Sequence, residues 1–180
     1  MIGYYKDPER TDEVLRDGWF HTGDIGVVED GFLKITDRKK EIFKTSGGKY
    51  VAPQLIENSL KESHLIEQCM VIGENRNFPA ALVVPAFDGV RKWCSKHGIN
   101  YTTDEDMIQD QRVVERIWKD VEKTNQGFGK WEQVKQIRLL PEMFTIEGGE
   151  LTPTLKLKRK PILTKYASLI EDIYSASASS

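Results

Sequence analysis

Apolar runs and helical patterns alternate along most of the chain. EQCMVIGE and PAALVVPAF are short apolar runs separated by NRNF, which predicts two buried strands that pair antiparallel. QVKQIRLLPE predicts a further strand. Helices are predicted at 88–97, 103–109 and 110–126, the last with its apolar residues at helical spacing. Thr103 and Asp106 resemble a capping box at the start of the middle helix.

Glycine and proline mark the predicted turns. GVVEDGFLKITDR predicts a hairpin that turns at its Asp-Gly pair, and EIFKTSGGKYVAP predicts a second, shorter hairpin. Pro53 can start a helix whose apolar side includes Leu55, Ile56 and Leu60. A final helix is predicted over 161–174, with Leu163, Tyr166, Leu169, Ile170 and Ile173 on one side. The class is therefore α+β, a small mixed or antiparallel sheet flanked by helices.

Composition excludes several classes of function. The 180 residues are 39% hydrophobic and 30% charged, with a net charge of −2, which does not favour binding to nucleic acid or an acidic membrane. The longest apolar run, 80–87, is far shorter than the ~20 residues of a membrane span. No secretory signal is expected from MIGYYKDPER, and the three scattered histidines predict no metal site. Cys69 and Cys94 lack CxxC spacing, so we expect buried free thiols in a reducing cytosol.

Two charged residues near the predicted hairpins could contact a nucleotide. Asp24 lies between glycines in WFHTGDIG, where its carboxylate could accept hydrogen bonds from sugar hydroxyls or simply cap the turn. Arg38 offers a fixed fork of donors for phosphate or ribose oxygens, or is a solvated strand end.

Glycines and lysines carry the remaining candidate chemistry. Gly47 and Gly48 are either a hairpin turn or backbone that a ligand approaches closely. Four basic residues crowd into 156–160, directly behind the glycine-containing loop IEGGE. A mobile loop there could deliver a lysine to a phosphate; the alternative is an exposed basic stripe. A nucleic-acid signal is least favoured, because no aromatic residue is interleaved.

Taken in order, these stretches resemble the C-terminal part of the AMP-forming acyl-CoA synthetases, the adenylate-forming family shared with firefly luciferase and peptide-synthetase adenylation domains. GYYKDPERT and DGWFHTGDIG resemble the end of the family's large domain, ITDRKKEIFKTSGGKYVAPQLIE its hinge and hairpin, and LTPTLKLKR its terminal lysine motif. The resemblance runs from Gly3 to about Tyr174. TDRKKE, SGGKYVAP, the helical insert near 88–126 and LTPTLKLKR are similar to the long-chain fatty acyl-CoA synthetase branch.

The resemblance implies a role for the first two charged residues and for the hinge. Asp24 would bind the ribose hydroxyls of ATP, and Arg38 would contact ribose and phosphate. Lys40 stands at the family's hinge position, where its backbone would take up a rotation of the small domain on the large one.

The same resemblance assigns the hairpin and the lysine. Gly47 and Gly48 would line the channel for the pantetheine arm of CoA. Lys156 would neutralise charge that develops at the α-phosphate during adenylation, with Lys158 as the fallback because the family's Gly-Lys pair is Leu-Lys here. His21 stands where many relatives have arginine.

The resemblance also implies a division of the chain. Residues 1–36 would be the tail of the large domain, 37–174 the mobile small domain, and 175–180 a disordered tail. A Ser/Thr/Gly-rich phosphate loop followed by Pro-Lys is not found in the sequence, so we expect a fragment with no ligase activity of its own. Its partner would be the missing N-terminal domain.

The implied activity belongs to the full-length protein. ATP, Mg²⁺, CoA and a fatty acid would be used, with none bound tightly by this fragment. The expected location is the cytoplasm, with peripheral membrane contact left open. The alternatives are a CoA ligase for an aryl, medium-chain or bile acid, and a non-catalytic interaction module of the same fold.

Overall fold

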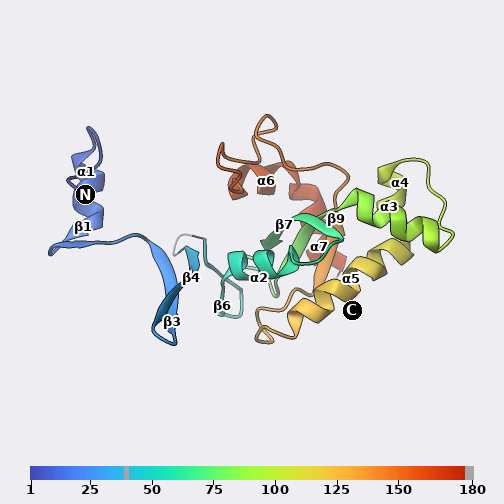
Figure 1. Ribbon diagram of the computed structural model, residues 1–180, viewed down its shortest axis with the longest axis horizontal. Helices are drawn as coiled ribbons and strands as arrows, with labels where there is room; N and C mark the ends of the chain where they lie inside the picture. Colours follow the sequence, from blue (N-terminus) through green and yellow to red (C-terminus); the bar gives the residue numbers. More distant parts are fainter. Residues whose placement is uncertain (39–40, 177–180) are drawn as a thin grey trace.

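A three-stranded sheet lies at the centre of the computed structural model, which describes residues 1–38 and 41–176 (Figure 1). Its strands, in spatial order, are β7 (Ile66–Ile72), β8 (Ala80–Pro85) and β9 (Gln136–Leu139). β7 and β8 pair antiparallel, as predicted, and β9 joins parallel to β8. A parallel neighbour needs a long crossover, which the helices between β8 and β9 provide.

The sheet is buried on both faces because successive side chains alternate between two cores. Val71 and Val83 belong to one core, whereas Met70 and Leu82 belong to the other, and all four are 0% exposed. This explains why the strands read as continuous apolar runs. Burial of this kind stabilises the domain by about 25 cal/mol per Å² of apolar surface.

Helices cover each face of the sheet. The first core is covered by α2 (Pro53–Leu60), α3 (Phe87–Lys96), α4 (Asp104–Gln109) and α5 (Gln111–Asn125). Three of these confirm the helices predicted at 88–97, 103–109 and 110–126. Thr103 and Asp106 form the predicted capping box: each side chain accepts a hydrogen bond from the other residue's backbone N–H at 3.2 Å.

The last helical segment differs from its prediction. Two helices, α6 (Arg159–Lys165) and α7 (Ala167–Ala176), replace the single helix expected over 161–174. Tyr166 leaves the helical conformation at φ −105° and ψ 21°, and its ring lies 6.4 Å from that of Phe144. Ile162 is fully buried and Leu163 is 39% exposed, whereas the prediction placed Leu163 on the apolar side.

The N-terminal elements extend away from this body in Figure 1. They are α1 (Pro8–Val14), β1 (Leu15–Arg16), β2 (Trp19–Phe20), β3 (Asp24–Glu29) and β4 (Phe32–Arg38), and β4 leads back to the body and contacts α2. β3 and β4 form the predicted hairpin, and its turn places Asp30 and Gly31 at φ 51° and 82°. The second predicted hairpin is also present, as β5 (Phe43–Lys44) and β6 (Tyr50–Val51).

The α+β class predicted from the sequence is confirmed by this arrangement. Cys69 and Cys94 are free and buried, as predicted, and burial raises the pKa of both thiols. Within the described ranges, none of the helices is both long and apolar enough to cross a bilayer.

Candidate functional site

Asp24 lies at the start of β3 and faces a cavity of about 630 Å³. Its backbone N–H donates to Thr22 Oγ1 at 3.0 Å, and Gly23 before it has a φ of 76°, which favours glycine. His21 and Arg10 line the same cavity. The cavity thus gathers a carboxylate, an imidazole and a guanidinium between α1 and the hairpin, a set that can exchange hydrogen bonds with a polar ligand.

Arg38 ends β4 directly opposite Asp24 in the hairpin register. The fold therefore brings together the two residues predicted to contact a nucleotide, although they are separated by a whole hairpin in the sequence. The predicted hinge residue, Lys40, lies outside the described residues.

The glycine pair at 47 and 48 forms the turn between β5 and β6. Gly48 has a φ of 80° and donates its N–H to the Thr45 carbonyl at 2.9 Å, so the left-handed conformation closes the turn. A Cβ on Gly47 would meet only Thr45 Oγ1, at 3.9 Å. Gly47 is thus not demanded by packing within the described part of the chain, which leaves room for a ligand to approach its backbone.

Lys156 lies near the tip of a small hairpin, residues 150–158, which we name the lysine hairpin. Leu151 and Leu157 form an antiparallel bridge, and Thr152 donates its N–H to the Lys156 carbonyl at 2.8 Å. The Lys156 N–H donates to Thr152 Oγ1 at 3.0 Å. Leu155 turns the chain at φ 59°, so the expected alternation of an extended segment is interrupted.

Both candidate lysines are exposed, but they occupy different places. Lys156 is held at the tip of the lysine hairpin, whereas Lys158 is at its base and forms the N-cap of α6. The Lys158 N–H donates to the Glu150 carbonyl at 2.7 Å.

Two buried carboxylates fasten the lysine hairpin at its ends. At the far end, Arg159 donates to Glu57 Oε1 at 2.8 Å and also to the Val71 carbonyl. At the near end, Lys165 donates to Glu150 Oε1 at 2.8 Å. Glu57 and Glu150 are 4% and 2% exposed. Burial raises the pKa of Glu57, and Arg159 opposes this; the pKa of Glu150 is lowered, chiefly by its hydrogen bond from Lys165.

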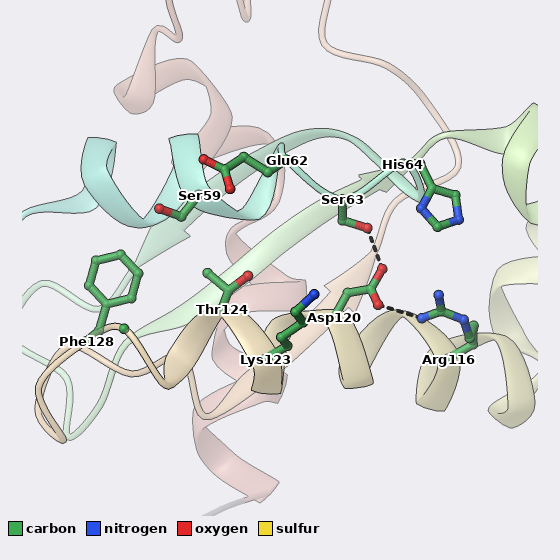
Figure 2. Close-up of a pocket in the computed structure, with 10 residues that line it drawn as sticks. Ser59, Glu62, Ser63, His64, Arg116, Asp120, Lys123, Thr124 and Phe128 are labelled. Carbon is green, nitrogen blue, oxygen red and sulfur yellow. Dashed lines mark hydrogen bonds and ion pairs between the residues drawn. The ribbon is translucent and has the colours of Figure 1, made fainter.

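The predicted residues do not all meet. Figure 1 places the orange segment that carries Lys156 beside α6 on the main body, away from the blue N-terminal elements around Asp24. Figure 2 shows a different cavity, of about 620 Å³, between the end of α2 and α5, where Ser63 and Arg116 both donate to the Asp120 carboxylate. The predicted site residues are not among its described lining residues, so it lies apart from the predicted chemistry.

Sequence reasoning missed the two buried carboxylates. Glu57 could have been found, because Pro53, Ile56, Glu57 and Leu60 follow helical spacing on one face, and all four are buried. Glu150 follows two glycines in a loop, so no periodic pattern in the sequence indicates that it is buried. Among the described residues, no three His, Cys, Asp or Glu side chains gather where they could hold a metal ion.

Solved structures define the class of the fold. The adenylation domain of a carboxylate reductase from Mycobacterium chelonae matches 96% of this chain with a TM-score of 0.78 and 26% identity, over 26% of that chain. The A-PCP didomain of a carboxylic acid reductase from Segniliparus rugosus, solved with AMP, matches 98% of this chain with a TM-score of 0.75 and 28% identity, over 24% of that chain. The fold is therefore that of a domain of adenylate-forming enzymes.

Sequence relatives place the chain more closely. Residues 40–178 match the AMP-binding enzyme C-terminal domain, and the chain belongs to that family. Long-chain-fatty-acid--CoA ligase 5 of Mus musculus is 45% identical over 97% of this chain, and FadD15, a long-chain-fatty-acid--CoA ligase of Mycobacterium tuberculosis, is 42% identical over 96%. The chain spans 26% and 29% of their lengths, about a quarter of these relatives. The resemblance identified from the sequence is confirmed.

Proposed function

We propose that this chain is the small domain of a long-chain fatty acid–CoA ligase. The whole protein would join a fatty acid to ATP, giving an acyl-adenylate and releasing pyrophosphate. The CoA thiol would then attack the acyl carbon, giving the acyl-CoA and releasing AMP. Support comes from the ligases that match nearly the whole chain at 42–45% identity.

The observation that carries the proposal is the lysine hairpin. Lys156 stands near its exposed tip, on backbone held by hydrogen bonds on both sides of the turn. An ammonium presented in this way can approach the α-phosphate and offset the charge that develops there. Lys158, at the base, remains the second choice because its backbone is tied into the start of α6.

The nucleotide-binding and hinge roles follow the same proposal. Asp24 would accept hydrogen bonds from the ribose hydroxyls, and Arg38, its neighbour across the hairpin, would contact ribose and phosphate. Lys40 would serve as the hinge between residues 1–36 and the domain that begins at 37. Gly47 and Gly48 would line the pantetheine channel, which is compatible with the open space beside Gly47.

The remaining features of the proposal concern partners and place. The missing N-terminal domain would be the partner that supplies the phosphate loop and the fatty-acid site, and Mg²⁺ would be held there with ATP. Two buried free thiols favour a reducing compartment, so we infer a cytoplasmic protein, with peripheral membrane contact left open.

A chimera tests the proposal. This chain would replace the aligned segment of FadD15, and the product would be assayed for AMP release with a panel of long-chain, medium-chain, aryl and bile acids. We expect activity with long-chain acids, none from the FadD15 remainder alone, and none from residues 1–180 alone. Lys156→Ala in the chimera should abolish adenylation but spare thioester formation from a preformed acyl-adenylate.

Other outcomes distinguish the alternatives. A folded chimera without activity would favour a non-catalytic interaction module and overturn the proposal. Equal loss of both half-reactions in Lys156→Ala would remove the role given to that lysine. Because the FadD15 part can itself select the acid, acyl preference is tested in the full-length protein that contains this chain. Activity there with aryl or bile acids only would replace the substrate class.

A further inference from the structure

The lysine hairpin is fastened at its first residue by a buried carboxylate. The Glu150 side chain is 3% exposed; Oε2 accepts from the Thr145 N–H at 3.2 Å and Oε1 from the Lys165 ammonium at 2.8 Å. Lys165 is the last residue of α6, the helix that follows the hairpin directly. The Glu150–Lys165 pair therefore joins the start of the hairpin to the helix that leaves its other end.

The two glycines before Glu150 serve this contact. A Cβ on Gly148 would collide with the Glu150 carboxylate and would lie 2.9 Å from Thr145 Oγ1. Gly149 adopts a φ of 83°, which turns the chain back so that the Glu150 N–H reaches the Thr145 carbonyl at 3.1 Å. The pair at 148 and 149 thus seats a buried carboxylate, whereas the sequence predicted a mobile loop there.

Hydrogen bonds and a buried leucine connect Glu150 to the tip of the lysine hairpin. The Glu150 carbonyl accepts the Lys158 N–H, Leu151 is buried in the second core, and Thr152 is joined to Lys156 in both directions. Each of these contacts fixes the backbone of one residue relative to a residue nearer the base of the hairpin. The backbone of Lys156 is therefore placed with reference to Glu150 and the core.

We propose that Glu150 and Lys165 are positioning residues, whose ion pair holds the lysine hairpin so that Lys156 moves with the domain as one rigid piece; the carboxylate of this pair is buried and the ammonium is partly exposed. This inference rests on the role proposed above for Lys156. Lysine has a long flexible side chain, so its ammonium can be placed accurately only if its backbone is fixed. A displacement of about 1 Å in a reacting geometry can cost about a hundredfold in rate. Rotation of the whole domain, with no separate loop motion, would then bring the ammonium to the phosphate.

The test compares three variants of the chimera with FadD15. Lys165→Met removes the ammonium and keeps the length of the side chain, Lys165→Arg keeps a positive charge, and Lys160→Met removes an exposed lysine from the same helix. Adenylation is followed as pyrophosphate release, and thioester formation as acyl-CoA produced from a preformed acyl-adenylate. We expect Lys165→Met to slow adenylation by about tenfold to a hundredfold, with thioester formation unchanged. Lys165→Arg should restore most of the rate, and Lys160→Met should leave both half-reactions unchanged.

Hydrogen exchange in residues 1–180 gives a readout that needs no activity. Lys165→Met should speed exchange of the amides of Lys156 and Lys158, whose acceptors are Thr152 Oγ1 and the Glu150 carbonyl, while the amides of β8 keep their protection. Unchanged exchange at both amides would show that the pair does not hold the hairpin and would overturn the inference.

The kinetic outcomes separate this inference from the proposed function. If the chimera with the unmodified chain forms no acyl-CoA, the proposed function fails and the role in positioning fails with it. If that chimera is active and Lys165→Met slows both half-reactions equally, the pair is merely structural. An active chimera in which Lys165→Met slows neither half-reaction also overturns the inference and leaves the proposed function intact.

Discussion

Replacing Arg159 by methionine removes one partner of the most deeply buried ion pair described in the chain. Glu57 keeps the Val71 N–H, which donates to Oε1 at 2.8 Å, and loses the guanidinium at the same distance. The Glu57 side chain is 5% exposed and that of Arg159 is 19% exposed, so water can replace the lost donor only poorly. Breaking such a pair from one side costs about 3 kcal/mol, because a charge remains buried without its counter-ion.

The stability lost in Arg159→Met should depend on pH, and the burial of Glu57 determines the direction. Burial raises the pKa of Glu57 above 4.5, and Arg159 opposes that rise, so removing Arg159 raises the pKa further. An acid with a raised folded pKa contributes stability that is fully present below its unfolded pKa and is lost as pH rises through the folded pKa. The deficit of Arg159→Met should therefore be smaller at pH 5 than at pH 7, because Glu57 can take up a proton.

Urea unfolding of residues 1–180, followed by tryptophan fluorescence, measures this deficit. With a slope of about 2 kcal/mol per M, a loss of about 3 kcal/mol lowers the midpoint by about 1.5 M at pH 7. Lys160→Met, an exposed neighbour in α6, is the matched control and should change stability by less than about 0.5 kcal/mol. Glu57→Gln combined with Arg159→Met should cost less than the sum of the two single changes. A deficit equal at pH 5 and pH 7, or no larger than that of the control, would refute the reasoning.

Three further changes test other parts of the structure by the same unfolding assay. Gly148→Ala forces a Cβ against the Glu150 carboxylate and should cost about 1–3 kcal/mol, whereas Gly47→Ala meets only one atom at 3.9 Å and should be nearly neutral; equal costs would contradict the close fit. Thr103→Ala removes the cap of α4 and should cost about 1 kcal/mol, with the adjacent Thr102→Ala as the control, and similar effects of the two would count against the capping box. The Lys165 ammonium beside Glu150 lowers the pKa of that carboxyl, so the stability that Glu150 contributes is present above pH 4.5 and is lost as pH falls through the folded pKa. Glu150→Gln should therefore lose less stability than the unmodified chain between pH 5 and pH 3. Equal losses of stability in the two proteins over this range would refute this.

Periodicity in the sequence was sufficient for elements that are long or bounded by strong turn signals. The strands at 66–72 and 80–85 lie next to each other in the chain, and their antiparallel pairing follows from that closeness. β9, at 136–139, was predicted as a strand. Its parallel pairing with β8 was not predicted, because some fifty residues separate the two strands. The break at Tyr166 was missed because neither glycine nor proline marks it.

The candidate site divides in the same way. Motifs indicated Lys156, Asp24 and the turn at Gly47 and Gly48 as candidates, because each motif consists of residues close together in the sequence. The anchors of the lysine hairpin depend on partners far apart: Glu57 and Arg159 are separated by 102 positions, and Glu150 and Lys165 by 15. Nothing local in a sequence indicates such a partner. The sequence therefore does not show which basic residue at 156–160 pairs with a buried carboxylate, and the fold shows that it is Arg159.

Buried counter-ions explain how a basic cluster can stand at the start of α6. Arg159 and Lys160 occupy the first turn of α6, which has no acidic residue, and positive charges there are unfavourable by about 0.3–1 kcal/mol each. Glu57 reaches this turn from α2 and offsets Arg159, while Glu150 offsets Lys165 at the other end of the helix. Both carboxylates are buried, whereas Lys156 is exposed near the tip of the lysine hairpin. The positive charges of Lys156, Lys158 and Lys160 are therefore exposed to solvent, while the carboxylates that pair with Arg159 and with Lys165 at short distance are buried.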